Sequence, residues 1–166
     1  MVRVSVEAPF LLSQAAFPQM KRRGYGRIVM TTSGPAMYVN AALQGLTTYS
    51  MGRGAQLGLM VSLAAEGGPF GVRVNAVSPV ATTRMTMSRD AEPMGPDLVA
   101  TGVVFLASAA CGVSGVILRA AGGRFSAARY AVTPGVDFGP EPTTPEAIAE
   151  RWAEIVDGSG GATGVL

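Results

Sequence analysis

Three short apolar stretches without polar alternation constrain the fold of this chain most strongly. They run from Gly26 to Ser33, from Val72 to Pro79 and from Gly115 to Gly123. A strand covered on both faces has this composition, whereas a strand with one face in water alternates apolar and polar residues. Strands buried in this way are typical of parallel sheets with helices on either side. We therefore predict about three parallel strands.

Segments with helical spacing of their apolar residues separate these stretches. The first helix is expected from about Ser5 to Arg23, the second from about Leu46 to Glu66, and the third from Leu98 to Ser108. Glycine ends the first two patterns, and Asp97 is the expected N-cap of the third. Strands that alternate with helices predict an α/β fold with helices on both faces of the sheet.

The C-terminal part of the chain, residues 126–166, has a different pattern. Turn-forming residues dominate Arg124–Pro142, which predicts an irregular segment. Thr143 lies three residues before Glu146, the spacing of a capping box, and an apolar stripe follows as far as Val156. We expect a helix at about 144–157 that docks on the domain of residues 1–125, followed by a flexible glycine-rich end.

Composition excludes several kinds of site and partner. The 166 residues include no histidine and one cysteine, Cys111, which excludes Ser-His-Asp catalysis, Cys-His catalysis and metal sites made of imidazoles or several thiolates. The 13 basic and 11 acidic residues give a formal net charge of +2, too small an excess to predict nucleic-acid binding. No apolar stretch approaches the roughly 20 residues of a membrane-spanning helix. We expect a soluble, cytoplasmic protein with no metal ion.

A serine, a tyrosine and an arginine form the most informative set of polar residues. Ser33 ends the first predicted strand, Tyr49 lies near the start of the second predicted helix, and Arg53 follows four residues later. The i, i+4 spacing places the phenol and the guanidinium on one helix face. Because a free tyrosine has a pKa of about 10, a tyrosine that acts as a base near neutral pH needs a nearby positive charge.

These residues and the segments around them resemble the short-chain dehydrogenase/reductase family, whose signature is a serine followed by Tyr-x-x-x-Lys. The resemblance covers Val4 to about Gly123 and includes GRIVMTTS, YSMGRGAQLGLMVSLAAEGG, GVRVNAVSP and DLVATGVVFLAS in the family's order. The segments VATTRMT, AGGRF and TTPEAIAERWAEIVD resemble, more narrowly, the (3R)-hydroxyacyl-CoA dehydrogenase units of multifunctional β-oxidation proteins. The family implies a Rossmann-like fold, here truncated to about three parallel strands with helices on both faces and a C-terminal helix.

The resemblance implies catalytic roles for four residues. Ser33 would orient the substrate, and Tyr49 would be the catalytic acid and base. Arg53 stands where the family has the lysine that binds the nicotinamide ribose, and Ser5 stands where it has the helix asparagine that completes the proton path.

The resemblance also implies an NAD or NADP cofactor and residues that would contact it. With Arg53, the residues expected at its nicotinamide end are Pro79, Val80, Thr82 and Thr83. Thr83 or Thr86 is expected near the cofactor phosphates, and Met85 in the substrate lid that follows.

The sequence also departs from the family pattern. It has no Thr-Gly-x-x-x-Gly-x-Gly segment, the turn that holds the adenine half of the cofactor, and four of the family's seven strands are not encoded. Arginine keeps the charge of the family lysine at position 53 but is a poor member of a proton relay, because its own pKa is so high. Tyr49 follows Ser33 by 16 positions, a longer gap than the family's, and Val80 replaces a common glycine.

Three functions remain open from these observations. The first is an NAD(P)-dependent oxidoreductase acting on a hydroxyl or carbonyl, with a 3-hydroxyacyl-CoA as one candidate substrate, whose activity is impaired in the isolated chain. The second is a catalytically inactive subunit that keeps the oligomerisation surface, and the third is a gene fragment.

The family implies a homo-oligomer or a paralogous subunit as partner, and no nucleic acid or membrane. The strand at Arg27–Thr32 would also leave an unpaired edge, which favours association.

Overall fold

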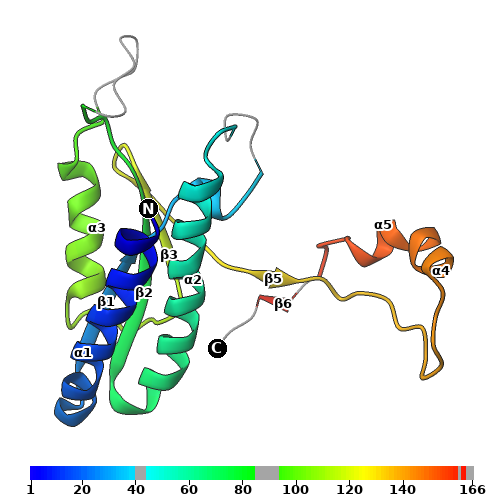
Figure 1. Cartoon of the computed structure of the whole chain (residues 1–166), viewed down its shortest axis with the longest axis horizontal. Coiled ribbons are helices and arrows are strands. Elements are labelled where there is room, and N and C mark those ends of the chain that lie inside the picture. The colour runs from blue at the N-terminus through cyan, green and yellow to red at the C-terminus, as the bar shows by residue number, and fades with distance from the viewer. Residues whose placement is uncertain (40–43, 85–93, 161, 164–166) are drawn as a thin grey trace. The chain divides into compact units, whose positions relative to one another are not determined.

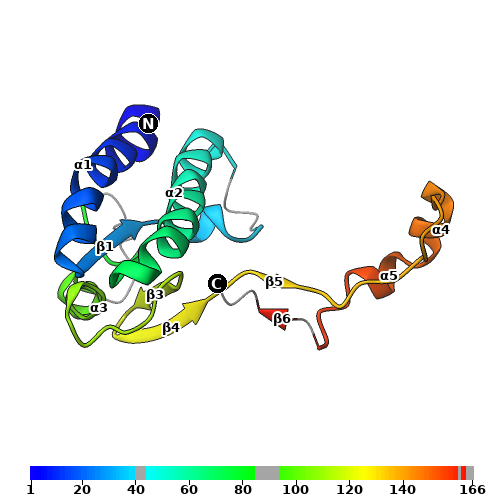
Figure 2. The ribbon, with the colours of Figure 1, turned by 90° about the horizontal axis from the view of Figure 1, so that it is seen from below.

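The computed structural model describes residues 1–39, 44–84, 94–160 and 162–163. The chain divides into two compact units, Met1–Ala128 and Arg129–Val165. The division falls slightly beyond the expected boundary at residue 125, because Arg124–Ala128, labelled β4 in Figure 2, forms a strand of the first unit, whose parallel strands are labelled in Figure 1.

The first unit is built on a sheet whose described strands have the order β1-β2-β3-β4. These strands are β1 (Gly26–Thr31), β2 (Val72–Val80), β3 (Ile117–Ala121) and β4 (Arg124–Ala128). The first three are parallel, with Gly26 of β1 opposite Val72 of β2 and Ala76 of β2 opposite Ile117 of β3, which confirms the predicted parallel strands. β1 lies at one edge of the sheet and β4 at the other.

β4 corrects the expectation that the chain is irregular from Arg124. It turns back from β3 at Gly122 and Gly123, whose φ angles of 52° and 78° lie in the left-handed region that favours glycine. β4 then pairs antiparallel with β3, with Ala121 opposite Arg124 and Ile117 opposite Ala128. Most of β4 is exposed, so it lacks the continuous apolar composition that identified the other strands.

The helices of the first unit cover both faces of the sheet, as the sequence predicts (Figure 2). On one face lie α1 and α2, and on the other lies α3. The helical segments are the π-helical turn η1 (Arg3–Glu7), α1 (Ala8–Arg23), the 3-10 turn η2 (Gly34–Ala36), α2 (Thr47–Gly67), the 3-10 turn η4 (Gly68–Phe70) and α3 (Asp97–Ala107). Asp97 is the first residue of α3 rather than its N-cap, which is Pro96.

Each face of the sheet has its own apolar core. Between the sheet, α1 and α2, the core includes Phe17, Leu57 and Met60. Between the sheet and α3, it includes Leu106 and the fully buried Cys111. These two layers explain why the parallel strands have no polar face in the sequence.

A buried amide fixes the loop that leads into β3. The side chain of Asn75 on β2 is fully buried, and its Nδ2 donates a hydrogen bond to the Val113 carbonyl over 2.9 Å. Its Oδ1 accepts a hydrogen bond from the Val116 N–H over 3.1 Å. The asparagine of the NAVSP segment therefore satisfies two backbone groups that have no partner in the sheet.

The second unit contains α4 (Pro145–Glu150), α5 (Trp152–Ile155) and a pair of two-residue strands, β5 (Ala131–Val132) and β6 (Ala162–Thr163). The expected helix at about 144–157 is thus interrupted at Arg151. Thr144 rather than Thr143 caps α4, because its side chain accepts a hydrogen bond from the Ala147 N–H over 3.2 Å. Docking of this helix on the first unit stays a prediction.

An ion pair stabilises α5. Arg151 Nε donates to one carboxylate oxygen of Glu154 over 3.0 Å, and Nη2 donates to the other over 2.5 Å. These hydrogen bonds hold the pKa of Glu154 below its usual value.

Within the part of the chain that the structure describes, no helix combines the length and apolar character required to cross a lipid bilayer.

Candidate active site

Tyr49 and Arg53 lie on adjacent turns of α2 near its N-terminal end. The centre of the Arg53 guanidinium is 5.2 Å from the centroid of the Tyr49 ring. This distance is within the range of a cation–π contact. The structure therefore brings the phenol and the guanidinium together, as the i, i+4 spacing predicts.

Three hydrogen bonds join α2 to the carboxyl end of β1. Arg53 Nη1 donates to the Thr31 carbonyl over 2.9 Å, and Thr32 Oγ1 donates to the Arg53 carbonyl over 3.1 Å. The Thr31 N–H donates to Gln56 Oε1 over 3.0 Å. We call these three bonds the α2–β1 clamp. Since Ser33 follows Thr32 directly, the clamp fixes the segment that carries Ser33 against the helix that carries Tyr49.

Ser33 lies just beyond β1 in an extended conformation, with φ −156° and ψ 154°. Its carbonyl accepts a hydrogen bond from the Ala36 N–H over 3.0 Å, which starts the turn η2. Among the described residues, neither the Ser33 hydroxyl nor the Tyr49 hydroxyl has a hydrogen-bond partner. Both groups are half-buried and remain available to a ligand.

Ser5 lies against the same part of α2. It is 2% exposed, and a Cβ atom added to Gly52 would lie only 2.8 Å from the Ser5 Cβ. This close approach of η1 and α2 depends on the missing side chain at Gly52. The Ser5 hydroxyl donates a hydrogen bond to the sulfur of Met1 over 3.8 Å, and among the described residues no hydrogen bond joins it to Tyr49 or Arg53.

The residues expected at the nicotinamide end of a cofactor follow the carboxyl end of β2. Pro79 and Val80 are exposed at this end, and Val80 pairs with Ala121 of β3. Thr82 is half-buried. Its N–H donates to the Met94 carbonyl over 2.7 Å, and its Oγ1 accepts from the Met94 N–H over 3.1 Å. Thr83 is exposed.

Thr86 and Met85, which the sequence places near the cofactor phosphates and in the lid, lie outside the described residues.

The parallel strands β1 and β2 end side by side, because Thr31 of β1 is opposite Val77 of β2 and the Thr32 N–H donates to the Val77 carbonyl. Ser33 therefore lies at the same carboxyl end of the parallel strands as Pro79 and Val80.

Gln56 is a site residue that the sequence analysis missed. It is 5% exposed, and burial of a glutamine side chain without a hydrogen-bond partner costs free energy. Its Oε1 has such a partner, because it accepts a hydrogen bond from the Thr31 N–H of the edge strand β1. Its position three residues after Arg53 places both side chains on one face of α2. That spacing was visible in the sequence, but its partner in β1 was not.

One polar atom of the site has no partner among the described residues. Arg53 Nε is buried and makes no hydrogen bond there, although Nη1 of the same side chain binds Thr31. A buried donor without a partner is unusual in a folded protein and is a candidate contact for a ligand.

Comparison with known proteins places these features in a family. A family model described as short chain dehydrogenase matches residues 1–94. The chain is 33% identical over 162 residues to the peroxisomal hydratase-dehydrogenase-epimerase of Saccharomyces cerevisiae, covering 94% of this chain and 18% of that protein. The match therefore includes almost the whole of this chain.

Solved structures agree with this match. The full-length peroxisomal multifunctional enzyme type 2 from Drosophila melanogaster is similar over 99% of this chain and 30% of that one, with a TM-score of 0.84 and 26% identity. A short chain dehydrogenase from Leptospira borgpetersenii with bound NAD+ is similar over 74% of this chain and 54% of that one, with a TM-score of 0.61 and 26% identity.

The chain spans 18% of the yeast protein, 30% of the Drosophila chain and 54% of the Leptospira chain. It therefore corresponds to part of each of these proteins. The family model covers more than half of the chain, and the parallel sheet with helices on both faces is the Rossmann-like fold that the resemblance implies. The chain belongs to the short-chain dehydrogenase family.

Proposed function

We propose that this chain supplies the substrate-binding and proton-transfer part of an oxidoreductase that uses NAD or NADP and acts on a hydroxyl or carbonyl group. The observation that carries the proposal is the α2–β1 clamp. It holds the Ser33 segment and the Tyr49 helix turn together at the carboxyl end of a parallel sheet, the end where α/β folds bind their ligands.

Each hydroxyl would have a separate task. The Ser33 hydroxyl would hold the substrate oxygen, and the Tyr49 hydroxyl would exchange the proton with that oxygen. The guanidinium of Arg53, centred 5.2 Å from the Tyr49 ring, would stabilise negative charge that forms on the phenol oxygen. A 3-hydroxyacyl thioester fits this chemistry as a substrate, since it carries a hydroxyl group to oxidise.

The residues present fit one half of a nicotinamide cofactor. The buried Arg53 Nε has no partner among the described residues and would donate to a ribose hydroxyl, with Pro79 and Val80 next to the nicotinamide ring. A bound nicotinamide would supply the hydride transfer. For the adenosine half, the sequence has no Thr-Gly-x-x-x-Gly-x-Gly turn. We therefore propose that cofactor binding needs polypeptide in addition to these residues.

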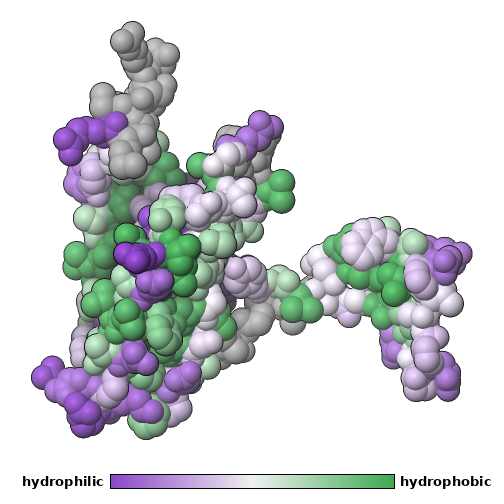
Figure 3. Space-filling model, viewed as in Figure 1, coloured by the Kyte–Doolittle hydropathy of each residue, from purple (hydrophilic) through white to green (hydrophobic). Residues whose placement is uncertain are grey.

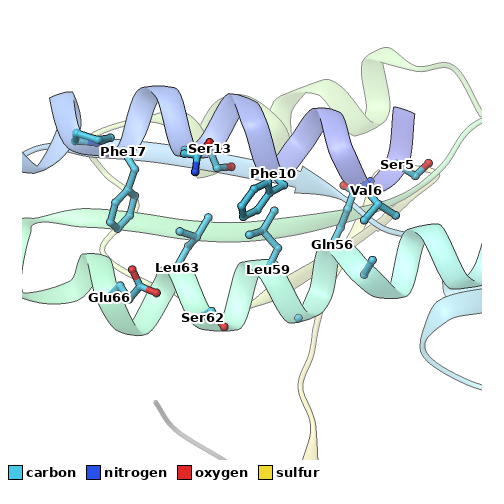
Figure 4. A pocket seen from close by; sticks show the side chains of 14 residues that line it. Ser5, Val6, Phe10, Ser13, Phe17, Gln56, Leu59, Ser62, Leu63 and Glu66 are labelled. Carbon is cyan, nitrogen blue, oxygen red and sulfur yellow. The ribbon is translucent and has the colours of Figure 1, made fainter. Parts of the chain in front are cut away.

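A groove between α1 and α2 supports an oligomer as the active form. Its volume is about 640 Å³, and Figure 4 shows Phe10, Phe17, Leu59 and Leu63 around it. Phe10 is 50% exposed, and the neighbouring Leu11 and Leu12 are exposed as well. Figure 3 shows hydrophobic surface on this side of the first unit. We propose that a second copy or a paralogous subunit covers this groove.

A second candidate function, an inactive binding subunit, is favoured by the contact between Arg53 and the Thr31 carbonyl. In that contact the guanidinium donates a hydrogen bond to a backbone carbonyl of β1. A chain without catalytic function could keep this arginine because the hydrogen bond stabilises the fold. Co-purification with a full-length paralogue and no turnover would be the result expected of such a subunit.

Cofactor titration separates the two functions. We expect NADH fluorescence to report binding when the chain is in its oligomer or is mixed with a subunit that contains the glycine turn. Turnover of a 3-hydroxyacyl thioester should then be lost in Tyr49→Phe and strongly reduced in Ser33→Ala, and Arg53→Lys should raise it. No binding at millimolar NADH or NADPH under any of these conditions would disprove the oxidoreductase proposal.

A further inference from the structure

A small cavity on the β3–β4 hairpin is lined by two arginines. Its volume is about 320 Å³, and Arg119, Ala121, Arg124 and Ser126 surround it. These residues share one face of the hairpin, because Arg119 is opposite Ser126 and Ala121 is opposite Arg124 in the antiparallel register. Ala120 packs into the core on the α3 side, so the cavity lies on the other face, the side of α2.

Neither arginine is neutralised by a described residue. Among the described residues, Arg119 and Arg124 have no hydrogen bond and no ion pair. The Arg119 guanidinium lies 5.6 Å from the centroid of the Tyr38 ring. Within the described part of the chain, no acidic residue lines the cavity. Two guanidinium groups without an acidic partner among the described residues create a positive potential around the cavity, and this potential attracts an anion.

The cavity lies beside the candidate active site. β3 is the neighbour of β2, and Ala121 is opposite Val80, one of the residues expected near the nicotinamide. On the other side, the Tyr38 hydroxyl packs against Gly34, the residue after Ser33, since a Cβ added to Gly34 would overlap it. The arginine cavity is thus joined to the Ser33 segment through Tyr38.

We propose that Arg119 and Arg124 form a subsite for a phosphate or diphosphate group carried by the substrate. A planar guanidinium binds a phosphate through two parallel hydrogen bonds, and two such groups can neutralise a dianion. The position at the carboxyl end of the sheet lets one molecule present its anionic end here and its reacting oxygen to Ser33. Assignment of the anion to a substrate rests on the proposed function, whereas binding of the anion does not.

Calorimetric titration of the full chain with inorganic pyrophosphate at low ionic strength tests the subsite. We expect saturable binding at one site, and a loss of affinity of about tenfold or more, equivalent to about 1.4 kcal/mol, in the double variant R119Q/R124Q. The matched control is R22Q/R23Q, which removes the same charge from the exposed end of α1. It should bind pyrophosphate as the unaltered chain does.

The other outcomes each decide the proposal. No binding by the unaltered chain at millimolar pyrophosphate, or an equal loss in both double variants, would overturn it. Acetate that binds as tightly as pyrophosphate would overturn the assignment to phosphate. Pyrophosphate binding that disappears in R119Q/R124Q while no turnover is found under any condition would support the subsite and disprove the oxidoreductase proposal, so the two failures are distinguishable.

Discussion

Replacement of Gly52 by alanine tests how closely η1 packs on α2 beside the candidate site. Gly52 is a buried glycine in the interior of α2. A Cβ added there would lie 2.8 Å from the Ser5 Cβ and 3.4 Å from the Ser5 Oγ. Carbon atoms in contact normally stay about 3.5–4.0 Å apart, so η1 would have to move away from the helix.

Two opposing effects set the size of the change. Alanine is favoured over glycine in a helix interior by about 1 kcal/mol, which stabilises the folded chain. Added volume in a well-packed contact costs about 1–3 kcal/mol, which destabilises it. With a packing cost of about 2 kcal/mol, the middle of its range, and a gain of about 1 kcal/mol from helix propensity, we expect Gly52→Ala to lower the free energy of unfolding by about 1 kcal/mol.

Gly54→Ala is the matched control. Gly54 lies in the same helix, and no atom lies within 4 Å of a Cβ added there, so only the gain in helix propensity applies. The control should raise the free energy of unfolding by about 1 kcal/mol, which separates the two variants by about 2 kcal/mol. Urea unfolding followed by far-UV circular dichroism measures the stability of both variants. Tryptophan fluorescence would not report on the first unit, because Trp152 lies in the second. Equal stability of the two variants would refute the close contact between Gly52 and Ser5.

Three further predictions concern individual hydrogen bonds. Gln56→Leu should remove the acceptor of the Thr31 N–H, and hydrogen exchange at that amide should become faster, while unchanged protection would contradict the α2–β1 clamp. Asn75→Ala should lower the free energy of unfolding by about 2–4 kcal/mol in urea, because two backbone groups lose their partner, and a loss below about 0.5 kcal/mol would show that they pair otherwise. In an NMR titration, Glu154 should titrate below a free glutamate and return to the ordinary range in Arg151→Gln, so the stabilisation from this ion pair is present above the ordinary glutamate pKa and is lost as the pH falls through the lowered pKa.

The fold was predictable for those segments in which burial determines the amino-acid composition. Runs such as GRIVMTTS and GVRVNAVSP are largely apolar and lack polar alternation because helices cover both faces of β1 and β2, and the structure confirms these strands. β4 is mostly exposed and carries Arg124 and Ser126, so composition did not reveal it. The signal that could have revealed it is the Gly122-Gly123 pair, which favours a tight hairpin.

The candidate site was predictable where helical spacing determines it. Tyr49 and Arg53 meet because residues four apart share a helix face, whatever surrounds the helix. The atoms that Arg53 binds depend instead on how α2 lies on β1, a tertiary relation that no local pattern encodes. For the same reason the roles of Gln56 and of the Arg119–Tyr38 contact emerged only from the structure.

The α2–β1 clamp has a consequence for any polypeptide that joins the sheet at β1. Backbone groups of an edge strand point outward at every second residue, and at Thr31 two helix side chains already occupy both of them. An added strand that pairs with β1 from its Gly26 end must therefore expel Gln56 and Arg53 before it reaches Thr31. Completion of the sheet and release of the guanidinium that lies against Tyr49 would then occur in one step.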